Sequence, residues 1–183
     1  MTKKSSGLAV AAVLLTTWSA DAHVTLDSRP ATIGTWYKAV FAVPHGCAGS
    51  ATTKVRVQIP DGVIDVKPMP KPGWNVEVLK GKYAAPYDFH GGKISEGAKE
   101  VVWSGGKLAD DNYDEFVIST FLTGALKPNT TLYFPVVQEC EQGISRWIDI
   151  PEEGHAAHGH DGMHMDMNEG KSPAPGVKLI PKP

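Results

Sequence analysis

Apolar and polar residues alternate along several short stretches of this chain. In residues 54–59 (KVRVQI) every second residue is apolar, as in a strand with one buried and one solvated face. Other runs rich in Val, Ile, Thr, Phe, Tyr and Trp are separated by clusters of Pro, Gly, Asn and Asp, which favour turns. The pattern predicts strands over residues 24–28, 35–43, 52–59, 64–67, 74–79, 99–103, 115–122, 130–139 and 144–150.

The same pattern argues against helices. No stretch keeps a 3.6-residue apolar period over the roughly ten residues that an ordinary helix needs. We therefore predict an all-β chain. Many short strands in a domain of this length favour an immunoglobulin-like or fibronectin-like β-sandwich, and a closed barrel is the alternative.

The first residues have the layout of a secretory signal peptide. Lys3 and Lys4 precede an apolar run over residues 8–15, and Ala20-Asp21-Ala22 follows. The run is shorter than the roughly 20 residues that span a bilayer. Residues 1–22 are therefore predicted to be removed by cleavage after Ala22, which makes His23 the first mature residue of a periplasmic or extracellular protein without a membrane span.

The mature chain is predicted to divide at Pro151 into one sandwich domain, residues 23–151, and a flexible, disordered tail, residues 152–183. The tail shows no strand pattern and is rich in Gly, Pro and charge. It also holds four of the seven histidines and three of the five methionines: His155, His158, His160, Met163, His164, Met165 and Met167. Imidazole suits Cu(II) and thioethers suit Cu(I), so the tail is predicted to collect copper, with zinc or nickel as alternatives.

Composition excludes several classes of function. The chain has 18 Lys and Arg and 20 Asp and Glu, a net charge of -2, which provides no basic field for nucleic acid. It has no Ser/His/Asp signature, phosphate-binding glycine loop or HExxH motif, so hydrolase and nucleotide-binding functions have no support. We expect a binding protein rather than an enzyme.

The two cysteines, Cys47 and Cys140, are predicted to form a disulfide, because export places them where thiols are oxidised. A loop of this length gives a stabilisation on the order of 4 to 5 kcal/mol in chain-entropy models. A metal site built on two thiolates is the alternative.

A histidine at a free N-terminus is an unusual ligand. Its α-amine and its ring Nδ1 can bind the same metal ion, which no internal histidine can do. Nitrogen ligands in a planar arrangement favour Cu(II), which also has the highest affinity of the common divalent ions. His23 is therefore the leading candidate ligand, and Cu(II) is the leading candidate metal.

Four short motifs carry a resemblance to a known family: His23-Val24-Thr25, residues 72–74 (PGW), residues 114–116 (DEF) and residues 143–147 (GISRW). In this order and spacing they resemble the YcnI-like domain, over most of residues 23–150. The resemblance implies an exported copper-binding β-sandwich. In that family the mature N-terminal histidine forms a single-histidine brace on Cu(II), helped by an acidic residue and a nearby tryptophan.

Carried over by position, the resemblance makes His23 the bidentate ligand, Glu115 the carboxylate and Trp147 the aromatic wall beside the metal. Glu139 and Glu141 flank Cys140 and are alternative carboxylates. Some family members carry a C-terminal membrane helix or a second copper-binding domain, whereas this chain has the His/Met tail.

The expected function is that of a Cu(II) chaperone or scavenger that exchanges copper with other trafficking proteins. His45 and His90 are predicted in loops. If either joined His23, the site would become a two-histidine brace like that of lytic polysaccharide monooxygenases, and a copper-dependent oxidase or monooxygenase would be the alternative. An adhesion or interaction sandwich with incidental histidines is the third possibility.

Overall fold

A computed structural model describes residues 23–27, 29–151 and 172–182, and all of the regular structure in these residues is β. Within them, no helix is long and apolar enough to cross a membrane. The described strands are β1 (Thr25–Leu26), β2 (Ala31–Thr32), β3 (Trp36–Val43), β4 (Thr52–Gln58), β5 (Val63–Pro68), β6 (Asn75–Phe89), β7 (Gly92–Leu108), β8 (Asp114–Leu122), β9 (Thr131–Tyr133), β10 (Val136–Cys140), β11 (Ile144–Trp147) and β12 (Gly176–Ile180).

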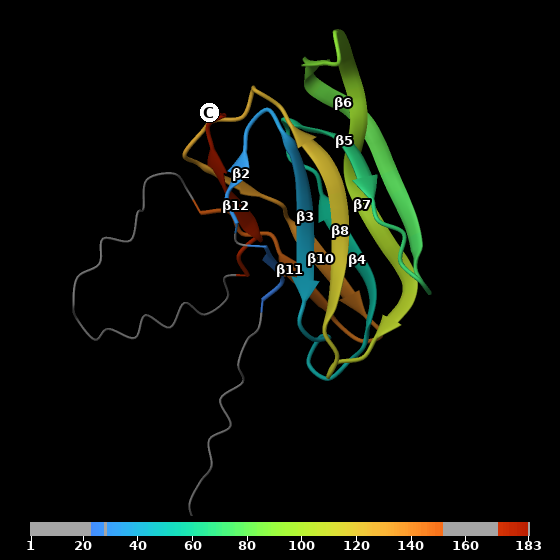
Figure 1. Cartoon of the computed structure of the whole chain (residues 1–183). Helices are drawn as coiled ribbons and strands as arrows, with labels where there is room; N and C mark the ends of the chain where they lie inside the picture. Colours follow the sequence, from blue (N-terminus) through green and yellow to red (C-terminus); the bar gives the residue numbers. More distant parts are fainter. Residues whose placement is uncertain (1–22, 28, 152–171, 183) are drawn as a thin grey trace, which may run out of the picture.

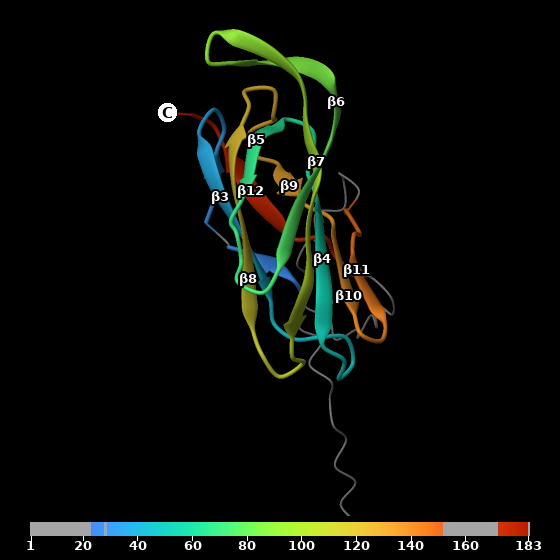
Figure 2. The ribbon, with the colours of Figure 1, turned by 90° about the vertical axis from the view of Figure 1, so that its right-hand side faces the viewer.

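The strands form two layers. One sheet has the order β1-β3-β8-β5 and the other has the order β11-β10-β4-β7-β6, both with antiparallel neighbours. Figure 2 shows β3 and β8 in one layer and β4, β10 and β11 in the other. A small sheet, β2-β12-β9, is the third group of strands (Figure 1). The predicted all-β sandwich is confirmed.

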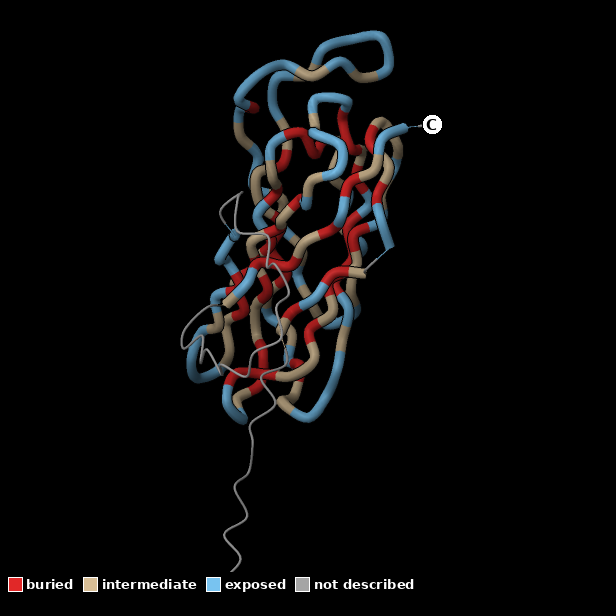
Figure 3. Tube along the Cα trace, turned by 90° about the vertical axis from the view of Figure 1, so that its left-hand side faces the viewer, coloured by how far each residue is buried: buried red, intermediate tan, exposed pale blue. Residues whose placement is uncertain are grey.

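Alternation along the strands explains how the layers pack. In β4, Val55 and Val57 are fully buried, whereas the alternating residues Lys54 and Arg56 point outward and are partly exposed. The same alternation in other strands places large side chains between the sheets, among them Trp103, Phe41 and Phe116. Figure 3 shows buried positions along the strands and exposed ones on the loops and turns.

The hairpin of β6 and β7 is much longer than the predicted strands over residues 74–79 and 99–103. Its far end projects beyond both layers (Figures 1 and 2). Residues 80–98 contain Gly, Pro and charged residues, which favour turns in the sequence. In the structure the strands continue past register shifts after Leu79 and Lys82, and they turn at His90-Gly91, where both residues have positive φ.

The predicted flexible tail is wrong in its last part, because Gly176–Ile180 forms β12. This strand pairs antiparallel with β9 and parallel with β2, and its Val177 and Leu179 are only 2% and 1% exposed. The run is short and its partners lie far away in the sequence, so local pattern alone did not reveal it. Residues 152–171, which carry the predicted copper-collecting side chains, and the predicted signal peptide 1–22 lie outside the described residues.

Two further strand boundaries differ from the prediction. The stretch 130–139 is divided into β9 and β10 around Phe134-Pro135, where a proline interrupts the ladder. The last predicted strand of the domain, 144–150, is shorter and ends at Trp147. Asp149 then makes a single parallel bridge to Pro173, so the chain around Asp149 lies beside the segment that leads into β12.

Candidate metal centre

His23 precedes β1, the edge strand of the four-stranded sheet. Its neighbours are anchored, because Val24 and Leu26 are buried in the core and Thr25 pairs with Ala42 of β3. His23 itself is half-buried. It lines a pocket of about 270 Å³ together with the rest of residues 23–26 and with residues 173–176, so the segment before β12 supplies one wall of the pocket.

Trp147 is the last residue of β11, the edge strand of the opposite sheet. Its side chain is only 4% exposed. The centroids of the His23 and Trp147 rings lie 5.0 Å apart with an interplanar angle of 63°, an edge-to-face arrangement. The structure thus brings together two of the residues that the resemblance singles out, one from each sheet.

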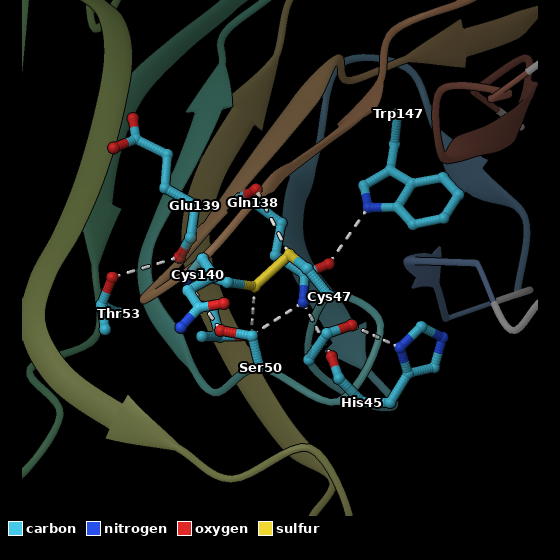
Figure 4. Close-up of a disulfide and its surroundings, with 11 residues drawn as sticks. His45, Cys47, Ser50, Thr53, Gln138, Glu139, Cys140 and Trp147 are labelled. Atoms are coloured by element: carbon cyan, nitrogen blue, oxygen red, sulfur yellow. Dashed lines mark hydrogen bonds between the residues drawn. A yellow bond between two sulfur atoms is a disulfide. The ribbon is translucent and has the colours of Figure 1, made fainter.

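A buried amide lies behind Trp147. The indole Nε1 of Trp147 donates to Gln138 Oε1 at 3.2 Å. Gln138 Nε2 donates to the carbonyl oxygen of His45 at 2.7 Å and to Thr52 Oγ1 at 2.8 Å (Figure 4). Gln138 was missed by sequence reasoning. Its signal is a polar residue at an inward position of β10, since buried polar groups of this kind need partners.

The predicted disulfide is present beside this amide. Cys47 and Cys140 are joined across 93 residues of sequence, with Cα atoms 6.0 Å apart. Cys47 opens a tight turn in which its backbone exchanges two hydrogen bonds with Ser50, and Gly49 has a φ of +88° there. The disulfide therefore ties this turn to the end of β10.

Glu115 lies in a different environment, on the exposed outer face of the four-stranded sheet. It pairs with Ala42, which pairs with Thr25, so the three residues form a row across β8, β3 and β1. The hydroxyl group of Tyr113 donates to Glu115 Oε1, and this hydrogen bond raises the pKa of the Tyr113 phenol above its usual value. In the described part of the chain, no contact joins Glu115 to His23.

The side chains near Glu115 range from partly buried to exposed. Lys71 Nζ lies 2.5 Å from Asp114 Oδ1 and donates to the backbone oxygen of Glu115 at 3.0 Å. Tyr113 is 59% exposed. The hydrogen bond from the exposed Tyr113 has little effect on stability, so it does not fix the Glu115 carboxylate firmly.

The alternative carboxylates, Glu139 and Glu141, are occupied by ion pairs. Glu139 contacts Lys54 Nζ at 2.9 Å and Arg56 at 3.7 Å, and Glu141 contacts Lys107 Nζ at 2.6 Å. Successive residues of a strand point to opposite faces, so Glu139 points away from the inward side chain of Gln138. Figure 4 shows its carboxylate on the far side from Trp147.

The other histidines of the described residues are His90 and His45, and His45 is the nearer to Trp147, because its backbone carbonyl shares the Gln138 amide with the indole. His90 is at the hairpin tip, where its ring contacts Phe89 at 4.2 Å, and the Nδ1 of His45 lies 2.5 Å from the Gly46 carbonyl oxygen. Within this part of the chain, no group of three or more His, Cys, Asp or Glu side chains is arranged to hold a metal ion. A chelate made by one N-terminal residue needs no such group, because both nitrogens belong to that residue.

Comparisons with known proteins agree with this fold. A crystal structure of an uncharacterized protein from Nocardia farcinica, described as having an immunoglobulin-like fold, matches with a TM-score of 0.58 and 24% identity over 86% of this chain and 98% of the other. No curated protein matches the sequence. The profile of a family described as Domain of unknown function (DUF1775) matches residues 23–179, from His23 into β12. The chain therefore belongs to this family, which is the YcnI-like domain family.

Proposed function

We propose that this protein binds Cu(II) outside the cytoplasm through His23 and acts as a copper chaperone or scavenger. The observation that carries the proposal is the edge-to-face contact of His23 with the buried Trp147 at the pocket between β1 and residues 173–176. Cleavage after Ala22 would free the α-amine of His23. The amine and the ring Nδ1 would then hold one Cu(II) ion as a chelate.

Trp147 would shield one side of the bound ion. Its indole is buried, so it presents an apolar surface beside the half-buried His23 ring. Such a surface excludes water and further ligands from that side, which controls access to a metal site. Open access remains on the pocket side, from which another copper-trafficking protein would deliver or remove the ion.

Glu115 remains the proposed carboxylate that offsets the charge of Cu(II). Two strand spacings, about 10 Å in all, separate it from Thr25 in β1, and His23 lies two residues before Thr25. Coordination would require its side chain to leave Tyr113 and lean along the sheet toward His23. Because the side chains of Glu115 and Tyr113 are both exposed, breaking the hydrogen bond between them costs little free energy.

We also propose that the His/Met-rich segment collects copper for His23, as Cu(II) on its histidines and Cu(I) on its methionines. That segment lies outside the described residues, but the described residues on its two sides meet. Ser172 donates its backbone N–H to Asp149 Oδ2 at 2.7 Å, and Pro173, which bridges to Asp149, lines the same pocket as His23. The described residues at both ends of the segment therefore lie beside the pocket that His23 lines.

Binding rather than catalysis is proposed, because a redox enzyme of this class would draw on further histidines beside His23. His90 lies at the tip of the projecting hairpin. His45 is nearer, in the turn after β3, where its backbone carbonyl shares the Gln138 amide with Trp147, and its Nδ1 lies 2.5 Å from the Gly46 carbonyl oxygen.

The test is a Cu(II) titration followed by electron paramagnetic resonance. The protein would begin at His23 and carry a short Gly/Ser linker in place of residues 152–171, so that β12 is kept and the His/Met tract is removed. The matched control has one extra alanine before His23. We expect one tightly bound ion with nitrogen hyperfine structure in the first protein, and an affinity at least about 100-fold lower in the control, because loss of a chelating nitrogen removes a strong ligand.

Each other result has a definite meaning. Equal affinity in the two proteins would contradict the histidine brace, and absence of tight binding in both would favour an interaction sandwich. Copper-dependent oxidation of ascorbate or turnover with peroxide would favour the oxidase alternative. The full-length protein should bind additional, weaker copper equivalents that the linker protein lacks, and equal stoichiometry would contradict the collecting role of the tract.

A further inference from the structure

The orientation of the Gln138 amide is fixed by its neighbours. The carbonyl of His45 can only accept a hydrogen bond, and the indole N–H of Trp147 can only donate one. The Nε2 of Gln138 therefore has to face His45, and its Oε1 has to face Trp147. The opposite orientation would place two donors together and two acceptors together in a site where Gln138 is only 1% exposed.

The Gln138 amide forms hydrogen bonds to three separate segments of the chain. Its partners belong to the turn after β3, to the start of β4 and to the end of β11. The disulfide strengthens the junction, because Cys47 lies two residues after His45 and Thr52 Oγ1 lies 3.7 Å from Cys140 Sγ. Figure 4 shows the amide of Gln138 between the disulfide and the indole of Trp147.

The indole of Trp147 stands between Gln138 and His23. One edge of the ring donates to the amide, and the ring system contacts the His23 ring at a centroid distance of 5.0 Å. A tryptophan at the end of an edge strand has only one neighbouring strand to hold it. Its hydrogen bond to a fully satisfied buried amide supplies a fixed orientation that strand pairing alone does not.

We propose that Gln138 is a positioning residue that holds the Trp147 ring against His23, with the Cys47–Cys140 disulfide holding the partners of Gln138 in place. The positioning concerns the metal-free protein. Its consequence for copper rests on the proposed function: the aromatic wall is set before the ion arrives, so the ion meets a preformed site and leaves it slowly.

The experiment uses the full chain from His23 to Pro183, labelled with ¹⁵N and free of metal. Two signals are followed by NMR, the indole N–H resonance of Trp147 and the ring-proton shifts of His23, which the neighbouring indole perturbs. In Gln138→Leu we expect the indole N–H to lose its hydrogen-bonded shift and exchange protection, and the His23 ring protons to move toward the values of a free histidine.

A matched pair of milder variants separates positioning from general destabilisation. Thr52 and Thr120 are both fully buried, and the Oγ1 of each makes a hydrogen bond, to Gln138 and to the Ile64 carbonyl respectively. Thr52→Val should shift the Trp147 and His23 signals in the same direction as Gln138→Leu. Thr120→Val should lower the melting temperature without moving them. This pair also decides the question if Gln138→Leu fails to fold.

The copper step is measured separately, with less than one equivalent of Cu(II) and a competing chelator. We expect Gln138→Leu to release Cu(II) about tenfold faster than the wild type, the order of magnitude found for groups that orient a metal site. Unchanged Trp147 and His23 signals in both Gln138→Leu and Thr52→Val would overturn the proposal. If those signals move but the wild-type protein binds no Cu(II) at His23, the positioning stands and the proposed function fails.

Discussion

The two places that supply the predicted site residues are built in opposite ways. Around Trp147, an aromatic ring is buried and hydrogen-bonded to an amide that is itself satisfied on three sides. Around Glu115, the hydroxyl group of Tyr113 also donates a hydrogen bond, but both residues are exposed. The first arrangement fixes a side chain in one position, and the second leaves it free to move.

The difference follows from the cost of leaving a polar group without a partner. A buried donor or acceptor that loses its partner costs about 1 to 3 kcal/mol, because no water replaces it. An exposed ion pair contributes about 0 to 1 kcal/mol, because water replaces the partner at once. In the proposed site, a rigid wall at Trp147 and a mobile carboxylate at Glu115 would let an ion bind without rebuilding the core.

The largest effect on stability is expected from removing β12, which follows the segment that lines the His23 pocket. Truncation after Pro151 deletes β12, including the buried Val177 and Leu179, whose side chains alone contribute about 3 to 6 kcal/mol. That is comparable with the whole stability of an ordinary domain, about 5 to 15 kcal/mol. We expect the truncated protein to be largely unfolded or to melt far below the intact chain, as measured by circular dichroism.

The control for this truncation is the protein in which a Gly/Ser linker replaces residues 152–171 and β12 is kept. It should unfold cooperatively at nearly the wild-type midpoint. If the truncated and linker proteins have the same midpoint, β12 does not belong to the cooperative unit, and the wall of the His23 pocket formed by residues 173–176 is dispensable for the fold.

An intermediate effect on stability is expected from removing the disulfide, which lies in the buried region around Gln138 and Trp147. The double variant Cys47→Ala/Cys140→Ala should lower the free energy of unfolding by about 2 to 5 kcal/mol, since a long loop is no longer closed in the unfolded chain. Urea denaturation of oxidised wild type and variant measures this. The exposed contact of Tyr113 with Glu115 gives the matched comparison, because Tyr113→Phe should cost less than about 1 kcal/mol. Equal losses would show that burial does not separate the two regions.

The sequence predicted the features that depend on local pattern or on chemistry at one residue. Alternation in residues 54–59 predicted β4, and the two cysteines predicted the disulfide. What it could not show depends on distant partners: β12 is defined by pairing with β2 and β9, and the role of Gln138 by three groups from other parts of the chain. His23 was singled out by its place after the predicted signal peptide and Trp147 through a family resemblance, and their contact across two sheets is visible only in the folded chain.

The smallest effect on stability is expected at Glu115, where it distinguishes a mobile ligand from a solvated charge. Tyr113 donates to the Glu115 carboxylate, which favours the neutral phenol and raises its pKa. Glu115→Gln should therefore lower the pKa of Tyr113 toward its ordinary value, measured by ultraviolet titration of the phenolate. Because the folded-state pKa is raised, the small stabilisation from this contact is present below about pH 10 and is lost as the pH rises through the folded-state value.

Copper binding by the same variant completes the comparison. If Glu115 leaves Tyr113 to coordinate Cu(II), adding copper to the wild type should lower the pKa of Tyr113, and Glu115→Gln should weaken Cu(II) binding by about tenfold, as loss of a supporting carboxylate does. If Glu115 is only a solvated charge and does not bind the metal, copper leaves the Tyr113 titration unchanged and the variant binds Cu(II) as tightly as the wild type. The carboxylate of the site would then have to come from another residue, and the buried Trp147 side alone would define the protein's contribution beyond His23.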